Sequence, residues 1–284
     1  MYKSKHPSST RRNWFFILPS LLGMAVFYFA PMLYSLIYAF SGNDGFAGLS
    51  NFADTLTNPT FQSAASNTLV FIAVCVPLNI ILAFLLASLL KGLRHKKLFT
   101  VIFMLPLVIP SGSVAFFWRS IFADNGLINR ILYTRGMETV YWFASPWTLL
   151  IVIIVFLFKN IGFNLVLFMA GFQLIPKDYY DIARIEGASA FQCFRKVTFI
   201  YMLPTTFLVL MMSIINSFKI FREIYLLFGQ YPYLSIYMLQ HYMNNQFAAA
   251  NMQRLSTAAT VLSLCIMVVV MFVFSIQRRF SDTL

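Results

Sequence analysis

The stretch DIARIEGAS, residues 181–189, separates two long apolar blocks of a 284-residue chain. It carries three charged side chains, although only 11% of the whole chain is charged and 60% is hydrophobic. Soluble domains carry about 25% charged residues. The composition therefore predicts an all-α protein that crosses a membrane several times, with this charged stretch outside the hydrocarbon.

Six apolar stretches are long enough to cross a bilayer, which takes roughly 20 residues. The first is longer than the apolar core of a cleavable signal peptide, so we interpret it as a retained helix. The spans make up a transmembrane domain of residues 15–279, between a tail of residues 1–14 and a tail of residues 280–284. The predicted spans are residues 15–38, 67–90, 98–119, 147–171, 200–221 and 256–277.

The distribution of Lys and Arg predicts the orientation of these spans, because such residues concentrate on the cytoplasmic side. Fourteen of the 21 lie in the first tail, in the connections at residues 91–97 and 172–199, and directly after the last span at residues 278–279. Six lie in the other connections or at their edges, and Lys159 lies inside the fourth span. Both termini and the stretch at residues 181–189 are therefore predicted to be cytoplasmic.

The cytoplasmic connection at residues 172–199 is predicted to form two short helices around a tight turn. Pro176 suits a helix start, and Gly187 suits its end because glycine adopts a left-handed conformation without a Cβ penalty. Ser189 and Gln192 match the S-x-x-Q capping box, which predicts a second helix from here to about Val197.

Side chains of this connection are candidates for contact with a partner. Tyr180, Ala183 and Gly187 fall on one side of the first helix, and Ala188 with Gly187 permits close approach of another backbone. The spacing alone is equally typical of a solvated amphipathic loop that caps the helical bundle.

The sequence lacks the motifs of nucleotide-binding proteins, metalloproteases and serine hydrolases. It contains no GxxxxGK phosphate loop, no HExxH and no GxSxG. Its histidines and cysteines are scattered without metal-ligand or disulfide spacing, and no Asp or Glu lies in the middle of a predicted span. The net charge of +12 sits in clusters between spans rather than on one face, so no nucleic-acid partner is indicated. We therefore expect no catalytic residue, no bound metal and no ATP site, and any energy for transport must come from another polypeptide.

The connection resembles the EAA loop of the inner-membrane permeases of ABC importers. Asp181-Ile182-Ala183 stands at the E-A-A positions, Gly187 at the glycine and Val197 at the isoleucine, whereas the closing proline is displaced to Pro204. The stretch is similar to the YEAARIDGAS variant of carbohydrate-uptake permeases of the maltose and glycerol-phosphate type. Further resemblance covers nearly the whole chain after residue 15: SNTLVF (66–71), GLIN (126–129), GFNLVLFMAGFQLIP (162–176) and YMNNQFAAANMQRLSTAAT (242–260). The sequence FGQYP (228–232) replaces the usual T-G-G-P.

This resemblance implies a type I importer permease fold in a prokaryotic cell membrane. It implies a heterodimer with a second, similar permease, two ATP-binding subunits and an extracytoplasmic binding protein that delivers the sugar. ATP and Mg²⁺ would be held by the ATPase. The loop would act as the coupling segment, in which Asp181 and Glu186 hold the loop or pair with basic groups of the ATPase. The residues expected to couple the permease to the ATPase are Tyr180, Asp181, Ala183, Glu186, Gly187, Ala188 and Ser189.

Polar residues within the spans predict a substrate pathway. Lys159 lies about 18 Å into the fourth span, and an intramembrane lysine is a functional-site hypothesis by default. We expect it to face a watery cavity with Asn160 and Asn164, and Asn216 and Lys219 of the fifth span to line the cavity mouth. The alternative for Lys159 is an interhelical salt bridge or hydrogen bonds to backbone carbonyl groups. Arg222 and Glu223 could also line the cavity mouth or meet the extracellular binding protein, whereas the simpler interpretation, favoured for Arg222, is a residue that snorkels to the outer boundary.

The segment that follows the fifth span is rich in aromatic and amide side chains. These suit sugar stacking and hydroxyl binding, but they suit an interfacial aromatic belt better. The prediction is thus the permease of an ATP-driven importer of carbohydrate, with an oligosaccharide as the expected substrate. Two alternatives are an importer of a non-sugar solute, such as a polyamine or a phosphate ester, and a membrane-embedded enzyme. The aromatic and polar residues are Tyr231, Tyr233, Tyr237, His241, Tyr242, Asn244, Asn245 and Gln246.

Overall fold

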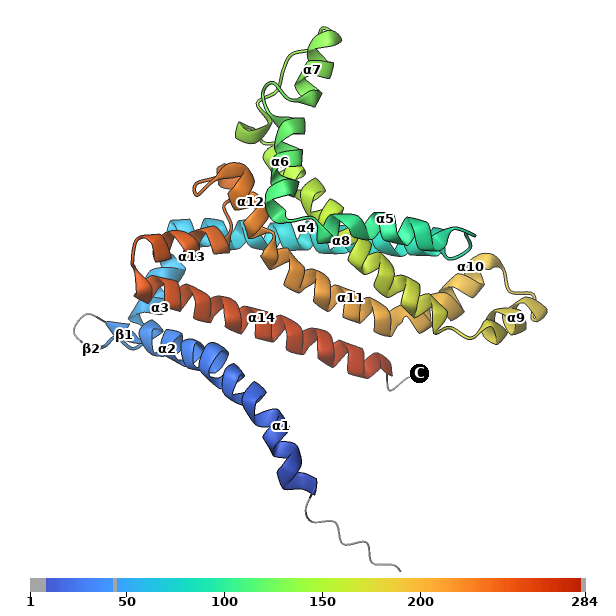
Figure 1. The fold of residues 1–284 in the computed structure, drawn as a ribbon, viewed down its shortest axis with the longest axis horizontal. Coiled ribbons are helices and arrows are strands. Elements are labelled where there is room, and N and C mark those ends of the chain that lie inside the picture. Colours follow the sequence, from blue (N-terminus) through green and yellow to red (C-terminus); the bar gives the residue numbers. More distant parts are fainter. Residues whose placement is uncertain (1–8, 43–44, 282–284) are drawn as a thin grey trace, which may run out of the picture. The chain divides into compact units, whose positions relative to one another are not determined.

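The computed structural model describes residues 9–42 and 45–281, which are almost entirely helical (Figure 1). Residues 1–8 and 282–284 of the expected tails lie outside the described residues. The chain divides into two compact units, residues 1–58 with 243–265, and residues 59–242 with 266–284. The all-α prediction is confirmed by this architecture.

The first unit begins with three helical elements that follow one another without a gap and together contain the first predicted span. After them the chain makes a two-residue antiparallel pairing, in which Ser41 pairs with Phe46. Asn51 donates from Nδ2 to the carbonyl groups of Ala39 (3.0 Å) and Ser41 (2.8 Å), so it ties the end of the first span to the helix that follows. The elements before residue 59 are α1 (Ser9–Met24), η1 (Ala25–Phe29), α2 (Ala30–Ala39), β1 (Ser41–Gly42), β2 (Gly45–Phe46) and α3 (Ser50–Thr57).

The second unit holds most of the predicted spans and both candidate sites. Its elements are α4 (Pro59–Leu90), α5 (Lys96–Val108), α6 (Ser111–Phe122), α7 (Leu127–Thr134), η2 (Trp142–Ala144), α8 (Thr148–Gln173), α9 (Lys177–Ile185), α10 (Ala190–Cys193), η3 (Phe194–Thr198), α11 (Phe199–Lys219), α12 (Phe221–Phe228) and η4 (Leu234–Ile236). The last two helices, α13 (Leu239–Ala248) and α14 (Met252–Ser281), each pass from one unit into the other.

Two apolar clusters along α4 and α8 form the core of the second unit. In the first, the rings of Phe71 and Phe156 meet edge to face with centroids 5.4 Å apart. In the second, the rings of Phe84 and Phe168 do the same at 5.3 Å. Because both pairs advance in the same sense along the sequence, α4 and α8 run in the same direction, as the second and fourth of six alternating spans must.

Helix α11 runs in the opposite direction along α8. Asn164 donates to the hydroxyl of Ser213 (2.7 Å), while a Cβ on Gly171 would meet the side chain of Thr205. The contact partners therefore descend along α11 as they ascend along α8. The absence of a side chain at Gly171 allows this close approach, and helices in a membrane typically pack through such small residues.

The third predicted span, residues 98–119, is not one helix. Helices α5 and α6 meet at a bend of 97°. Ile109 is extended (φ −68°, ψ 129°) because a residue before proline avoids helical geometry, and Pro110 then precedes the first turn of α6. By length and composition, the described residues contain five helices able to cross a membrane, or six if the bent pair is one span.

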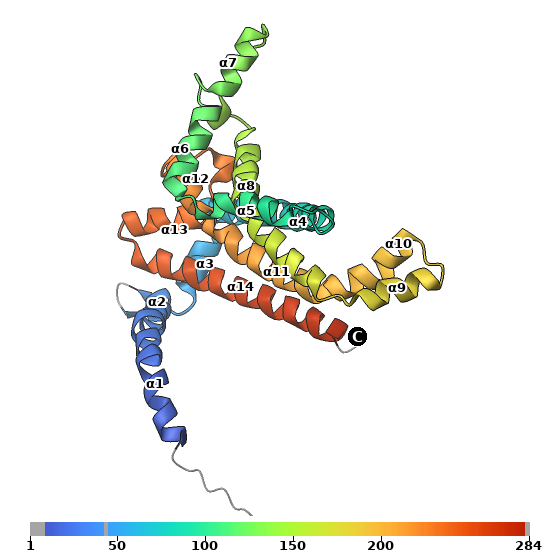
Figure 2. The same cartoon turned by 45° about the vertical axis from the view of Figure 1, so that its right-hand side comes forward.

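The two ends of the second unit differ in structure. In Figures 1 and 2, α9 and α10 form a helical hairpin at one end of α8 and α11. Helices α6, α7 and α12 lie toward the opposite end in both views. The hairpin end includes the connection between α4 and α5, which is the side that the positive charges predict to be cytoplasmic.

Candidate functional site

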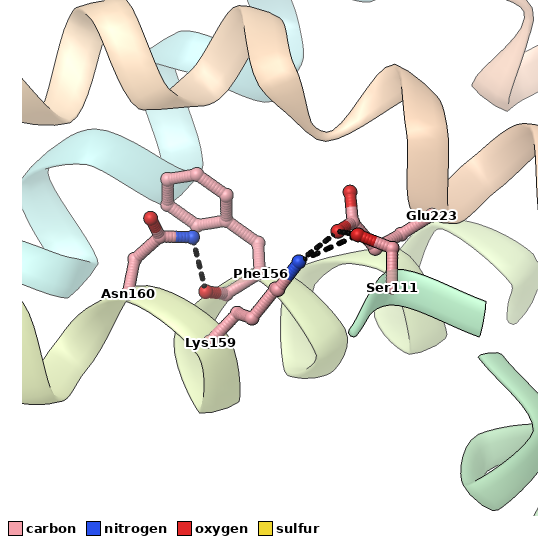
Figure 3. A network of polar contacts seen from close by, with 5 residues as sticks. All are labelled: Ser111, Phe156, Lys159, Asn160 and Glu223. Atoms are coloured by element: carbon pink, nitrogen blue, oxygen red, sulfur yellow. Dashed lines mark hydrogen bonds and ion pairs between the residues drawn. The ribbon is translucent and has the colours of Figure 1, made fainter. Parts of the chain in front are cut away.

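A polar triad inside the second unit joins three helices. The ammonium of Lys159 on α8 forms an ion pair with Glu223 on α12 and donates to Ser111 Oγ on α6 at 2.8 Å (Figure 3). The Ser111 hydroxyl donates in turn to Glu223 Oε1 at 2.6 Å. Since Ser111 lies in the first turn of α6, the bend at Pro110 is what brings it to the carboxylate.

Both charges of the triad are shielded from solvent. The side chain of Lys159 is 17% exposed and that of Glu223 is 4% exposed. A buried charge is costly unless it is paired and hydrogen-bonded, and each of these charges meets that condition. The N-terminus of α6 also favours a nearby negative charge. The structure thus contains the interhelical ion pair that was one of the interpretations of Lys159.

The same lysine lines a hollow of about 170 Å³. Asn160 donates from Nδ2 to the carbonyl of Phe156 (2.9 Å), and Lys219 donates to Asn216 Oδ1 (3.2 Å). Four of the five predicted pathway residues therefore lie together. The lining residues are Leu107, Lys159, Asn160, Asn216, Lys219, Ile220, Arg222 and Glu223.

Asn164, the fifth predicted pathway residue, does not line this hollow. It is 1% exposed and lies between α8 and α11, where its amide donates to Ser213. It follows Lys159 by five residues, which turns it away from the lysine's face of the helix. Its place in the structure is in helix packing rather than in the hollow.

Sequence reasoning missed Ser111 and did not pair Glu223 with Lys159. Arg222 and Glu223 were expected at the cavity mouth or against the binding protein, yet Glu223 is 3% exposed and central to the triad. One signal was available: an unpaired lysine at depth requires an acid, and Glu223 is the one acid at the end of a span. Nothing in the sequence indicated Ser111, because its position depends on the 97° bend.

The second candidate site is the hairpin that contains residues 181–189. Gly187 has φ +77°, and the backbone N–H of Ala188 donates to the carbonyl of Ala183 (2.9 Å). The N–H of Gly187 donates to the carbonyl of Arg184 (3.0 Å). This pair of bonds is a Schellman motif, which ends α9 at the glycine as the sequence predicted.

The capping box predicted at Ser189 is confirmed. The backbone N–H of Gln192 donates to Ser189 Oγ (3.3 Å), and the backbone N–H of Ser189 donates to Gln192 Oε1 (2.7 Å). The second helix does not end near Val197, however. It continues through η3 into α11 and α12, giving one span over Ala190–Phe228, because neither glycine nor proline interrupts it before α11.

One side of α9 packs against the rest of the unit. The Tyr180 hydroxyl lies 2.9 Å from Thr198 Oγ1, and Ala183 packs against the second apolar cluster. Lys91, at the end of α4, places its ammonium 4.8 Å from the ring centre of Phe172 and 5.6 Å from that of Tyr180. These contacts attach the hairpin to α4 and α11.

The other side of α9 is open. Ile182 is 52% exposed and Ile185 is 86% exposed, next to an exposed Asp181–Arg184 ion pair of 3.7 Å. Glu186 and Gly187 are exposed beside them. An exposed apolar tip on a rigid turn is typical of a surface that docks another protein.

The aromatic segment after α12 divides between surface and core. Tyr231 is 74% exposed, as a belt residue would be, whereas Tyr242 is 1% exposed. His241 is fully buried, its Nδ1 accepts from the Met238 N–H at 3.3 Å, and burial lowers its pKa to about 4. Among the described residues, no three His, Cys, Asp or Glu side chains come together in a way that could hold a metal ion.

A helical membrane bundle with a charged hollow inside it and a rigid hairpin at one end defines a transport subunit. The chain belongs to the family of binding-protein-dependent transport system inner membrane components, whose sequence profile matches residues 79–284. It is therefore a multi-pass membrane permease of the ABC importer class.

Individual relatives have related descriptions. The chain is 31% identical over 225 residues to the arabinooligosaccharides transport system permease protein AraP of Bacillus subtilis, covering 75% of this chain and 71% of that protein. It is 28% identical over 222 residues to the lactose transport system permease protein LacF of Rhizobium radiobacter, covering 75% and 74%. A chain in the crystal structure of a bacterial ABC transporter involved in the import of the acidic polysaccharide alginate matches with a TM-score of 0.83 at 23% identity, covering 95% of this chain and 96% of that one. This last likeness concerns the fold.

Proposed function

We propose that this chain is the membrane subunit of an importer that takes up carbohydrate, with energy supplied by a separate ATPase. The observation that carries the proposal is the exposed hairpin around Gly187, which offers Ile182 and Ile185 to a partner. The sequence has no phosphate-binding loop of its own, so the partner at this surface is the subunit that hydrolyses ATP.

Carbohydrate is the substrate class that the relatives support. Their descriptions name lactose, arabino-oligosaccharides and, for MsmF of Streptococcus mutans, multiple sugar-binding transport. The hollow at Lys159 provides two asparagine side chains, and amide groups both donate to and accept from sugar hydroxyls. Asn160 and Asn216 are thus the residues to which we assign hydroxyl recognition.

The assembly we propose contains a second, similar permease, two ATP-binding subunits and an extracytoplasmic binding protein. One six-span chain provides half of a pathway. A related crystal structure is described as an alginate transporter in complex with a periplasmic protein bound to an alginate pentasaccharide. Docking of such a protein would take place at the end of the unit opposite the α9–α10 hairpin.

The mechanism we infer is alternating access driven through the hairpin. Closure of the ATPase pair would displace α9, which is fixed to α4 and α11 through Tyr180 and Lys91. A packed helical unit moves between discrete arrangements rather than deforming continuously, so this displacement would reorient the hollow.

The test is co-purification of the tagged permease with its ATPase, comparing wild type with Ile185→Ser. The matched control is Tyr133→Ser, which changes a side chain that is 76% exposed on α7, away from the hairpin. We expect Ile185→Ser to lose most of the bound ATPase and the sugar uptake, and the control to retain the bound ATPase. Normal ATPase recovery and uptake in the Ile185 variant would contradict the docking surface.

The substrate class is tested separately. The binding protein that co-purifies is heated alone and with single saccharides, since a bound ligand raises the melting temperature. A rise with a saccharide, and uptake of the same saccharide by the assembly, supports carbohydrate import. A rise only with polyamines or phosphate esters would refute it.

A further inference from the structure

The hollow at Lys159 carries an excess of positive charge. Its charged lining consists of Lys159, Lys219, Arg222 and Glu223. The single carboxylate is already engaged by Lys159 and Ser111. Two positive charges therefore remain, one on Lys219 and one on Arg222.

Neither of these two cations is neutralised within the part of the chain that the structure describes. Lys219 donates to the neutral Asn216 and forms no ion pair, and Arg222 forms none either. Both side chains are exposed, whereas Lys159 and Glu223 are shielded. The hollow thus combines a charge-balanced interior with a cationic rim.

The two rim cations have a definite spatial relation. Lys219 ends α11 and Arg222 lies in the first turn of α12, three residues later. Residues three apart on adjoining helical turns lie about 5–6 Å apart at their Cβ atoms, close enough to contact one anionic group together.

Neutral hydrogen-bonding groups lie next to these cations. The amide of Asn160 donates from Nδ2 to its own helix, which leaves its carbonyl oxygen to accept from a hydroxyl group. Asn216 also lines the hollow, but its Oδ1 accepts from Lys219, so its amide N–H groups are the ones that can donate to a hydroxyl group. A ligand that satisfies both the cations and the amides must carry hydroxyl groups and a negative charge.

We infer that the hollow selects an anionic saccharide, with a sugar carboxylate placed between Lys219 and Arg222. This inference rests on the proposed function and adds the charge of the substrate to it. A guanidinium binds a carboxylate in a bidentate manner, and Lys219 adds a point charge. The volume of about 170 Å³ is below the 300–1,000 Å³ of most ligand pockets, so this chain holds part of the saccharide and the second permease holds the rest.

The experiment measures binding of two probes to the purified permease–ATPase assembly. The probes are trigalacturonate and its carboxyl-reduced, neutral counterpart, which share size and linkage. Each is titrated at low and at high salt into wild type, the Lys219→Gln/Arg222→Gln variant, and Arg135→Gln as a control. Arg135 is an exposed cation that follows α7 and does not line the hollow, so it reports non-specific attraction to a basic protein.

We expect wild type to bind the acidic trisaccharide about tenfold more tightly than the neutral one, with a preference that falls as salt rises. The double variant should lose this preference while still binding the neutral probe, and Arg135→Gln should keep it. Equal affinity for the two probes in wild type, or an unchanged preference in the double variant, overturns the inference.

These outcomes separate the inference from the proposed function. If the assembly binds and imports neutral saccharides without any preference for acidic ones, carbohydrate import stands and the anionic selectivity falls. If neither probe binds and no saccharide is imported, both fall together.

Discussion

The ion pair between Lys159 and Glu223 allows a quantitative prediction for three variants: Lys159→Met, Glu223→Gln and the two combined. Removing one partner of a buried pair costs about 3–5 kcal/mol, because it leaves the other charge uncompensated. Replacing both partners removes the charges together and is often close to neutral. The prediction is therefore strong non-additivity.

The structure also predicts which single variant suffers more. Lys159→Met leaves a carboxylate that is 4% exposed with only the Ser111 hydroxyl as donor, so we expect a cost of about 4 kcal/mol. Glu223→Gln leaves a lysine that is 17% exposed and that still donates to Ser111, so we expect about 2–3 kcal/mol. The double variant should lie within about 1 kcal/mol of wild type.

The assay is the apparent melting temperature of the purified permease, followed by intrinsic fluorescence at one fixed scan rate. A cost of 4 kcal/mol corresponds to a decrease of about 10 °C for a chain of this size. Lys219→Gln is the matched control, because this exposed lysine lines the same hollow with one hydrogen bond and should shift stability by less than about 0.5 kcal/mol. A double variant whose loss equals the sum of the single losses would refute the reasoning.

Three further predictions concern the hairpin, the helix packing and pH. Gly187→Asn should keep the turn, whereas Gly187→Val should cost about 1–2 kcal/mol because the backbone at this residue has φ +77°. The Val variant should still insert into the membrane but lose coupled ATPase activity. The measurement compares ATPase activity with and without the loaded binding protein. Gly162→Ala should lower the melting temperature markedly because its Cβ would overlap backbone atoms of α5, whereas Gly112→Ala, with open space around it, should not. Burial lowers the pKa of His241 from 6.5 to about 4, so the folded state keeps this side chain neutral at pH values at which the unfolded chain binds a proton. The free energy of unfolding should therefore be highest above pH 6.5 and should decrease by about 3 kcal/mol as the pH falls from 6.5 to 4. Melting temperatures between pH 7.5 and 4.5 should show a steeper loss in wild type than in His241→Asn, and equal slopes would contradict the burial argument.

Local features of the sequence predicted much of this structure. The turn at Gly187 and the capping box at Ser189 depend on residues at most five positions apart, so they could be identified without knowledge of the fold. The spans followed from apolar length, and their alternation agrees with the directions of α4, α8 and α11.

Features that depend on distant contacts could not be predicted in this way. Lys159 and Glu223 are 64 residues apart, and their meeting depends on how α8 and α12 pack. The proline at residue 110 was visible, but proline is tolerated within spans, so its presence did not indicate a 97° bend. Asn164 was assigned to the hollow on spacing alone, although its partner, Ser213, lies on a helix whose position the sequence did not specify.

The hollow and the hairpin lie on the same two helices, and this connects the candidate sites mechanically. From Lys159 to the end of α8 at Gln173 the helix extends about 21 Å, and α9 begins at Lys177. On the other side of the hairpin, one unbroken span carries Asn216 and Lys219. Since α8 and α11 are packed at Gly171, a displacement of the hairpin must move both helices as a pair.

The element against which this pair would move is the bend between α5 and α6. Ser111, at the start of α6, contacts the lysine of α8 and the glutamate of α12, so it joins the bend to both sides of the hollow. A change in access to the hollow therefore has to alter the hydrogen bonds of Ser111. Ser111→Ala should weaken the energetic coupling between Lys159 and Glu223. The variant should also bind the ATPase at the hairpin normally while its transport rate falls. A Ser111→Ala permease that transports normally and keeps the full coupling energy would show that the bend is only a support for α6.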